Sequence, residues 1–198
     1  MAFDAKGRLW VTTSYEYPFP KKLGEPARDS IKIFEDKDGD GTFETVTTFV
    51  DNLNIPIAVL PYGDGCLAWS IPNIWYFRDT DGDGKADKRE IVFGPLGWER
   101  DTHGNISSFR RGTDGWIYGT HGFNNNSTFK AKDGSTITVN SGNTYRFRPD
   151  GSRIEQYTWG QVNPFGMCLD ERGYLYTADC HSSPIYQLIQ GGYYPSFG

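Results

Sequence analysis

Short runs of apolar and aromatic residues, broken by Asp- and Gly-containing turns, recur along the whole chain. Four segments share the order apolar strand, polar turn, aromatic strand: MAFDAKGRLWVTTS from Met1, IAVLPYGDGCLAWS from Ile57, ISSFRRGTDGWIYGTHG from Ile106 and FGMCLDERGYLYTADCHS from Phe165. β-Branched and aromatic residues favour strands, whereas Gly and Asp favour the tight turns between strands. Each segment therefore predicts a β-hairpin.

The four predicted hairpins recur at a nearly constant interval. Their turn glycines, Gly7, Gly65, Gly115 and Gly173, are 58, 50 and 58 residues apart. A second hairpin follows each of the first three, and a single strand, IYQLIQ, follows the fourth. Four short antiparallel strands per repeat of this length are typical of a β-propeller blade. The sequence thus predicts an all-β propeller of four-stranded antiparallel blades, with about four blades present.

The predicted blades divide one repeat domain, residues 1–198, into residues 1–54, 55–102, 103–162 and 163–198, the last of them incomplete. We expect a partial, open propeller that exposes an unpaired sheet edge at each end. A four-bladed ring closed by its end strands is the alternative. The composition agrees with a β protein rich in turns, since 16% of the residues are aromatic and the chain has 24 Gly and 11 Pro.

Two of the predicted hairpin tips carry alternating carboxylates, in FEDKDGDGTFE and FRDTDGDGKAD. The spacing matches an EF-hand loop, but flanking runs such as NIWYF and REIVF favour strands over helices. Crowded carboxylates repel one another unless a cation neutralises them. We therefore expect two calcium sites, with ion-free solvated turns as the alternative. One would use Asp36, Asp38, Asp40 and Glu44, and the other Asp79, Asp81, Asp83 and Asp87.

Charge and cysteine content exclude several classes of function. The net charge is −5 and no basic stripe occurs, so nucleic acid is not an expected partner. The sequence contains no run of about 18 apolar residues, the length that a transmembrane helix needs. Cys66, Cys168 and Cys180 are odd in number and form no CxxC or CxxCH motif, which argues against a disulfide framework, zinc or covalent haem. The first ten residues do not resemble a signal peptide, so we expect a piece of a longer protein.

All three histidines are predicted to lie on one face of the blades. In a four-stranded meander, the first and third turns lie on one side, and the second loops and the connections between blades lie on the other. His103, His121 and His181 all fall in loops of this second side. Because function concentrates in loops held by a rigid scaffold, this face is the candidate site.

Three long segments of the sequence resemble a known family. DTHGNISSFRRGTDGWIYGTHGFNNNSTF, GNTYRFRPDGSRIEQYTWGQVNPFGMCLD and GYLYTADCHSSPIYQLIQGGYYPSFG resemble bacterial proteins described as membrane-bound dehydrogenase domains, propellers often fused to a c-type haem domain. This resemblance covers essentially the whole chain. More distantly, the chain is similar to soluble glucose/sorbosone dehydrogenases, six-bladed propellers that use pyrroloquinoline quinone. Two patterns carry this second similarity: His103-Gly104-Asn105 followed by Asp114-Gly115-Trp116-Ile117-Tyr118, and Val162-Asn163-Pro164-Phe165-Gly166.

The resemblance implies a dehydrogenase-like propeller that oxidises sugars or related alcohols with a quinone cofactor. It also implies a c-type cytochrome domain in the full-length parent, and a periplasmic or extracellular location. By position, His103 would be the catalytic general base. Asn105 and Asn163 would contact the cofactor. His121 and His181 are further candidates for contacts with the cofactor or a metal, and the alternative role for the histidines is to anchor their loops.

One position departs from the dehydrogenase pattern. Val162 stands where that family has the Arg that binds the anionic quinone, so Arg100, Arg110 or Arg111 would have to replace it. The alternative function is a non-catalytic carbohydrate- or protein-binding platform. Such a platform would stack sugars on Trp98, Trp116 and Tyr118, unless these aromatic residues pack between blades.

Overall fold

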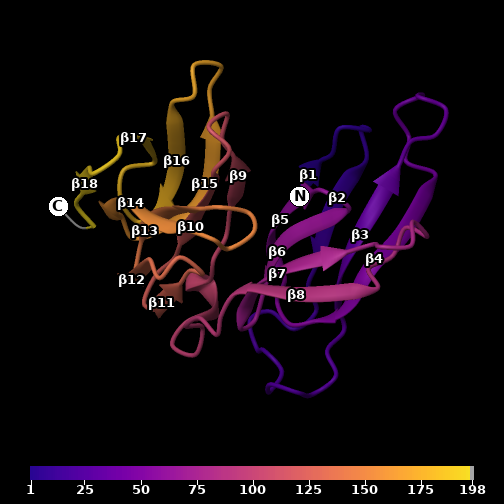
Figure 1. Cartoon of the computed structure of the whole chain (residues 1–198), viewed down its shortest axis with the longest axis horizontal. Coiled ribbons are helices and arrows are strands. Elements are labelled where there is room, and N and C mark those ends of the chain that lie inside the picture. Colours follow the sequence, from indigo (N-terminus) through magenta and orange to yellow (C-terminus); the bar gives the residue numbers. More distant parts are fainter. Residues whose placement is uncertain (197–198) are drawn as a thin grey trace. The chain divides into compact units, whose positions relative to one another are not determined.

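The computed structural model describes residues 1–196, which consist almost wholly of strands and loops (Figure 1). The chain divides into two compact units, residues 1–91 and 92–198. Within the described residues, the only helical element is the 3₁₀ turn η1 (Thr102–Gly104). The described part of the chain contains no helix long and apolar enough to cross a membrane.

The first unit is built from two antiparallel four-stranded meanders. The first sheet contains β1 (Ala2–Phe3), β2 (Leu9–Thr13), β3 (Asp29–Glu35) and β4 (Thr45–Leu53) in sequence order. The second contains β5 (Ile57–Tyr62), β6 (Gly65–Ser70), β7 (Asn73–Arg78) and β8 (Lys88–Phe93), again in sequence order.

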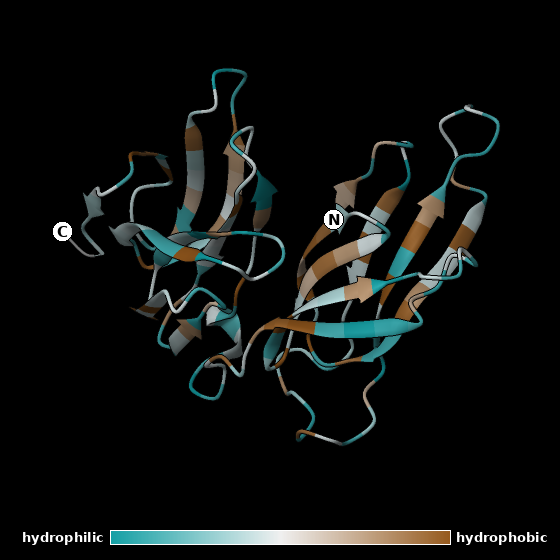
Figure 2. Cartoon of the chain, in the orientation of Figure 1, coloured by the Kyte–Doolittle hydropathy of each residue, from teal (hydrophilic) through white to brown (hydrophobic). Residues whose placement is uncertain are grey.

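Alternation of side chains places the core of the first unit on one face of each sheet. Ile31 and Ile33 on β3 are buried and pack with Trp10 of β2 and Phe77 of β7, while Lys32 between them is only partly buried. This is the two-residue period of a strand with one buried face. The outer strand β8 is charged over its first half, residues 88–90, and apolar over its second half, which ends at the buried Phe93 (Figure 2).

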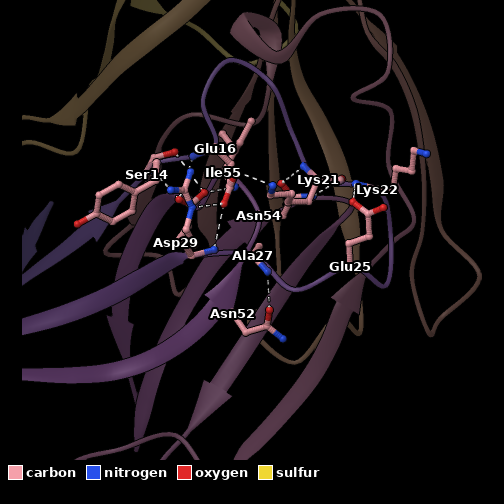
Figure 3. A network of polar contacts seen from close by, with 12 residues as sticks. Ser14, Glu16, Lys21, Lys22, Glu25, Ala27, Asp29, Asn52, Asn54 and Ile55 are labelled. Carbon is pink, nitrogen blue, oxygen red and sulfur yellow. Dashed lines mark hydrogen bonds and ion pairs between the residues drawn. The ribbon is translucent and has the colours of Figure 1, made fainter.

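Buried polar groups hold the long loop between β2 and β3, residues 14–28 (Figure 3). Asp29 is completely buried and accepts hydrogen bonds from the backbone N–H groups of Tyr15 (2.5 Å), Glu16 (3.2 Å) and Ile55 (2.8 Å). Asn54 accepts from the backbone N–H of Lys21 at 3.1 Å and donates to its carbonyl at 2.9 Å. A buried carboxylate such as that of Asp29 needs hydrogen-bond donors. The bonds of Asp29 and Asn54 therefore fix the loop to the strand ends.

The second unit contains two further sheets and a separate hairpin. One sheet has β9 (Phe109–Arg111), β10 (Ile117–His121), β13 (Asn143–Phe147) and β14 (Ile154–Gly160), extended by the parallel strand β18 (Tyr193–Tyr194). The other has β15 (Asn163–Leu169), β16 (Leu175–Cys180) and β17 (Ile185–Leu188).

The separate hairpin, β11 (Asn126–Lys130) and β12 (Thr136–Asn140), is a correction to the blade pattern, which places this segment in a loop. Ser127 and Phe129 are buried while their strand neighbours are exposed. The alternation of buried and exposed residues, followed by a turn at Asp133-Gly134, is typical of a hairpin. The blade pattern did not predict it because that repeat already had four predicted strands. The insertion lies between the second and third strands of its sheet.

The fold class predicted from the repeats is confirmed. The structure is all-β, with four sheets of the antiparallel blade type in sequence order and almost no helix, a four-blade, propeller-like arrangement. Gly7, Gly115 and Gly173 adopt the left-handed backbone expected of turn glycines. In the second sheet Gly63 (φ 56°) takes that role. The open arc and the predicted blade boundaries stay predictions.

Candidate functional site

His103 lies in η1, where it pairs with Asp101. The Asp101 Oδ1 atom accepts the His103 backbone N–H at 2.8 Å and lies 3.0 Å from His103 Nδ1. An ionised carboxylate can only accept, so Nδ1 is the ring nitrogen that donates to Asp101. The His103 side chain is 60% exposed and that of Asp101 is 21% exposed. The imidazole is therefore oriented by a carboxylate and accessible from solvent.

Asn125 holds the segment that carries this pair. Its Oδ1 accepts from the backbone N–H groups of Arg100 and Asp101, both at 3.3 Å. Its Nδ2 donates to the carbonyls of Asp101 at 2.6 Å and Gly104 at 3.2 Å. Asn125 is 1% exposed, so these bonds are shielded from water. The loop is thereby fixed by a side chain from the region after β10.

Asn163 joins a second and a third loop to the same place. Its Nδ2 donates to the His103 carbonyl at 3.3 Å, and its Oδ1 accepts from the Phe123 backbone N–H at 3.2 Å. Gly104 and Gly122 make this approach possible. A Cβ on Gly104 would lie 1.7 Å from the Phe123 carbonyl oxygen, and one on Gly122 would lie 2.5 Å from Asn163 Oδ1. Only glycine fits at these two contacts.

Asp179, near the end of β16, anchors the Asn163 segment. Its carboxylate accepts from the backbone N–H groups of Val162 at 2.9 Å and Asn163 at 2.6 Å, and also from the Ser182 hydroxyl. Asp29 holds two consecutive backbone N–H groups in the first unit in the same way. Thus four loops of the second unit meet around Asn163: residues 101–104, 122–125, 162–163 and 179–182.

Asn105 is the most unusual residue of this region. It is 1% exposed, yet neither its Oδ1 nor its Nδ2 has a hydrogen-bond partner among the described residues. A buried polar group left without a partner costs roughly 1–3 kcal/mol. Such a cost is accepted where a bound molecule or water completes the hydrogen bonds. The predicted contact of Asn105 with a cofactor stays a prediction, and its unpaired amide agrees with a binding role.

His121 has a different environment from His103. It is 1% exposed, its Nδ1 lies 2.9 Å from the Ser141 carbonyl and its Nε2 lies 2.8 Å from the Ser127 hydroxyl. A carbonyl only accepts, so Nδ1 carries the proton and Nε2 accepts from Ser127. Burial lowers the pKa of His121 and keeps the ring neutral. The residue anchors the β11–β12 hairpin, and the predicted cofactor contact remains untested.

His181 lies two residues after Asp179, directly after β16, and is exposed. Its φ of 76° is in the left-handed region, which His adopts more readily than most side chains. The structure therefore places His181 in a loop anchored to the Asn163 segment. Its predicted cofactor contact stays a prediction.

The groups that position His103 were not predicted from the sequence. Asp101 stands two residues before His103, and this short spacing was the available signal. Asn125 and Asp179 gave no such signal, because their partners are backbone groups in distant segments. Two aromatic residues next to the Asn163 contacts were also missed: Phe123 is 38% exposed and Phe165 is 48% exposed.

The structure gives little support for another arginine taking the place of the one that is missing at Val162. Val162 is 1% exposed, so its side chain is enclosed by protein. In the β9–β10 register, Arg110 and Arg111 pair with Tyr118 and Ile117, at the end of β10 opposite His121. Of the three arginines, only Arg100 lies on the loop that carries His103.

Two aromatic residues proposed for sugar stacking are buried. Trp116 is 7% exposed and Tyr118 is 6% exposed. The Arg148 guanidinium lies 4.0 Å from the Trp116 ring centroid and that of Arg146 lies 4.7 Å away. The Trp116 ring thus packs against protein cations, and the Tyr118 ring meets that of Tyr157 edge to face with the ring centroids 5.1 Å apart, so neither ring is free to bind a sugar face.

The first acidic loop connects β3 to β4 and gathers four carboxylates. Asp36, Asp38, Asp40 and Glu44 each offer an oxygen within 4.8 Å of the others. Asp36 accepts hydrogen bonds from the backbone N–H groups of Gly41 (2.8 Å) and Gly39 (2.7 Å). Both bonds lower the pKa of Asp36, and the bond from Gly41 has the larger effect. Such an all-oxygen group matches the donors that calcium prefers.

The second acidic loop connects β7 to β8 and repeats this geometry with one difference. Asp79 accepts from Gly82 (2.7 Å) and Gly84 (2.9 Å), and Asp79, Asp81 and Asp83 form the cluster. Asp87 lies outside it: its two oxygens accept from the Thr80 backbone N–H (3.0 Å) and hydroxyl (2.5 Å). The Thr80 hydroxyl lowers the pKa of Asp87. Asp87 therefore closes the loop instead of joining the cluster.

Comparison with solved structures supports the fold and nothing finer. The crystal structure of a Thermus thermophilus protein, inferred to be an oxidoreductase (glucose dehydrogenase), superposes with a TM-score of 0.53 and 17% sequence identity. The match covers 98% of this chain and 62% of that one, so the chain spans less than two thirds of that protein's length.

Sequence comparisons give one family. No curated protein matches the chain. A model of a domain of unknown function, DUF7133, matches residues 1–196. The chain therefore belongs to the DUF7133 family.

Proposed function

We propose that the loops around His103 form the active face of a dehydrogenase-like propeller that oxidises sugars or related alcohols. The observation that carries this proposal is the exposed imidazole of His103, held 3.0 Å from the Asp101 carboxylate. The similarity in fold to a protein described as a glucose dehydrogenase agrees with this reaction class. The four loops that meet at Asn163 provide the rigid support that such a site needs.

His103 would act as the general base. Its Nε2 takes the proton of the substrate hydroxyl while the hydrogen on the same carbon leaves as hydride to an electron acceptor. The imidazolium formed in this step faces Asp101, whose negative charge stabilises it. The buried, unpaired amide of Asn105 would supply a hydrogen bond to the bound molecule.

Pyrroloquinoline quinone is the acceptor that the resemblance implies, and when bound it would supply the carbonyl that accepts hydride. The residues present fit it poorly. The buried Val162 side chain offers no charge to an anionic quinone, and Arg100 is the one arginine among those considered that lies on the His103 loop. The residues that the structure describes therefore do not form a recognisable quinone site. On the basis of the resemblance alone, we propose that electrons pass to a c-type haem domain of a periplasmic or extracellular parent protein.

The general-base role is tested by the variant His103→Ala in the complete protein. Dye reduction is measured over a panel of sugars and alcohols, with and without added quinone. We expect turnover to fall by about 10²- to 10⁴-fold, the usual effect of removing a general base. The melting temperature should stay unchanged, since the side chain is exposed. Unchanged turnover in this variant would refute the role of His103.

A non-catalytic carbohydrate-binding platform is the second candidate. Two exposed aromatic residues favour it, because sugar faces stack on aromatic rings: Phe123, whose backbone N–H donates to Asn163, and Phe165, two residues after Asn163. If the protein has this function, we expect it to bind sugars but to reduce no dye, either with or without added quinone. In that case Phe123→Ala would weaken binding and His103→Ala would not.

We also propose that the two acidic loops bind calcium and that these ions stabilise their hairpins without taking part in chemistry. The carbonyls of Thr42 and Lys85, at the seventh position of each loop, would complete the oxygen ligands. The cluster of four carboxylates in the first loop supports this proposal more strongly than the three in the second.

A further inference from the structure

An open cleft of about 490 Å³ lies in the second unit, apart from the loops around His103. It is formed by the turn between β12 and β13, the end of β14, and the segment that contains β18. We call it the aromatic cleft. Its lining includes Asn140, Asn143, Trp159, Gln161, Tyr193 and Ser196. A volume of this size is within the range of small-molecule sites.

Two exposed aromatic side chains stand next to each other in this cleft. Strand β18 pairs in parallel with β14, with Trp159 opposite Tyr193. Residues opposite each other in a parallel pair project from the same face of the sheet. Trp159 is 44% exposed and Tyr193 is 70% exposed. The pairing therefore brings two exposed aromatic residues to neighbouring positions in the lining of the cleft.

The backbone that carries these rings is firmly held. Trp159 donates its N–H to the Gly192 carbonyl at 3.0 Å, and Gln161 donates to the Tyr194 carbonyl at 2.6 Å. Gly160 has a φ of 84°, and a Cβ there would lie 1.8 Å from the Tyr194 oxygen. Only glycine allows the two strands to approach in this way. The strand positions that carry the two rings are thus fixed by the backbone.

The remaining lining is polar and uncharged. Gln161 and Asn143 are buried and support the wall: Gln161 Nε2 donates to the Thr177 hydroxyl at 3.0 Å, and Asn143 Nδ2 donates to the Asn140 carbonyl at 2.6 Å. Asn140 is exposed and lines the cleft. None of the described lining residues carries a charge. A charged ligand would leave its charge without a partner here, whereas a neutral polyhydroxyl ligand would not.

We propose that the aromatic cleft binds a neutral saccharide, with a sugar ring lying across Trp159 and Tyr193 and its hydroxyls meeting the amide of Asn140. Sugars combine an apolar C–H face, which an aromatic ring covers, with hydroxyls that amides recognise. This site goes beyond the proposed function, because it shares no residue with the His103 loops and needs no redox step. It would bind a saccharide whether or not the protein is an enzyme.

The proposal is tested by titration calorimetry of the complete protein with neutral oligosaccharides, after a glycan array has selected the best of them. We expect Trp159→Ala and Tyr193→Ala each to weaken binding about tenfold or more, as for an aromatic residue at the centre of an interface. Trp159→Phe keeps a ring and should retain most of the affinity. The matched control is Tyr174→Ala, since Tyr174 is 51% exposed and lies outside the cleft.

The outcomes separate this site from the proposed active site. His103→Ala should leave the cleft affinity unchanged even if it abolishes turnover. Binding that Trp159→Ala and Tyr193→Ala do not weaken, in variants whose melting temperatures match the parent, would overturn the proposal. The same conclusion would follow if the parent bound acidic saccharides alone, or no saccharide on the array.

Discussion

Two histidines of the second unit show how environment decides the role of one residue type. His103 is 60% exposed and its Nδ1 faces a carboxylate, whereas His121 is 1% exposed and both of its ring nitrogens are hydrogen-bonded within the protein. The first arrangement orients an exposed imidazole toward a carboxylate. The second uses the imidazole to join two backbone segments. The two side chains therefore respond differently to substitution and to pH.

Replacement of Asp101 by Asn tests the orientation of His103. Asn retains the N-cap of η1 but removes the negative charge that faces the ring, so we expect turnover to fall by about tenfold or more with little change in KM. Steady-state kinetics of dye reduction provide the measurement. Asp170→Asn is the matched control, because Asp170 also accepts the backbone N–H two residues on, at 2.9 Å, without an imidazole partner. Equal kinetics in both variants would contradict a positioning role for Asp101.

The buried His121 predicts a loss of stability in mild acid. Burial lowers its pKa in the folded state below the unfolded value of about 6.5, so the unfolded chain binds a proton more readily. The free energy of unfolding should therefore fall as the pH drops below about 6.5 and continue to fall down to the lowered folded pKa. Denaturant unfolding at several pH values measures this slope. His121→Asn should lower stability at neutral pH and flatten this part of the slope, and an unchanged slope would contradict the assignment.

At the scale of elements, the acidic loops are hairpin connections held by their own backbone. In both loops the first Asp accepts the N–H groups of two glycines, and the alternating carboxylates follow. At the ninth position both carboxylates accept the backbone N–H of the second loop residue, Lys37 to Glu44 at 3.1 Å and Thr80 to Asp87 at 3.0 Å. Glu44 also joins its cluster, whereas Asp87 also accepts from the Thr80 hydroxyl. The first loop thus has four clustered carboxylates and the second has three.

Calcium should stabilise the β3–β4 hairpin through the first loop. An ion present at one hundred times its dissociation constant stabilises the folded state by about 2.7 kcal/mol. A chelator should then lower the melting temperature by several degrees, and Asp38→Asn should reduce this effect. Asp150→Asn, in the ordinary turn between β13 and β14, is the control and should leave the calcium dependence intact. A melting temperature that is the same with calcium and with chelator would exclude ion binding at these tips.

The elements also show what period-two patterns miss. The hairpin β11–β12 alternates buried and exposed residues, but it lies inside a repeat that already has its four predicted strands. Strand β18 has two residues and pairs in parallel with β14, which no local pattern indicates. Both elements depend on contacts with strands that lie elsewhere in the sequence.

At the scale of the whole molecule, the two kinds of candidate site belong to different units. Both acidic loops lie within residues 1–91, whereas the His103 loops and the aromatic cleft lie within residues 92–198. Buried hydrophobic clusters are found in each unit, around Trp10 and Phe77 in the first and around Trp116 and Met167 in the second. Each unit thus has apolar contacts of its own.

This separation predicts that calcium removal acts locally. Hydrogen exchange with and without chelator should show faster exchange in residues 29–53 and 73–91, because unfilled carboxylate clusters loosen the tips of these hairpins. Residues 101–105 and 159–164 should be unaffected, and saccharide affinity should stay the same. Faster exchange in the second unit on chelation would show that calcium supports the candidate site as well.

The sequence alone determined the repeats, because strand and turn preferences act over a few residues. It predicted the four sheets, the hairpin positions of the acidic loops and the placement of His103 and His181 outside the strands, whereas His121 is the last residue of strand β10. The contact between Asn163 and His103, sixty residues apart, was decided by tertiary structure, as were the burial of Val162, the two partners of His121 and the pairing of Trp159 with Tyr193. These features depend on which distant segments meet, and that is set by packing of the sheets and by buried polar groups that must find partners. A local sequence pattern does not predict those partners.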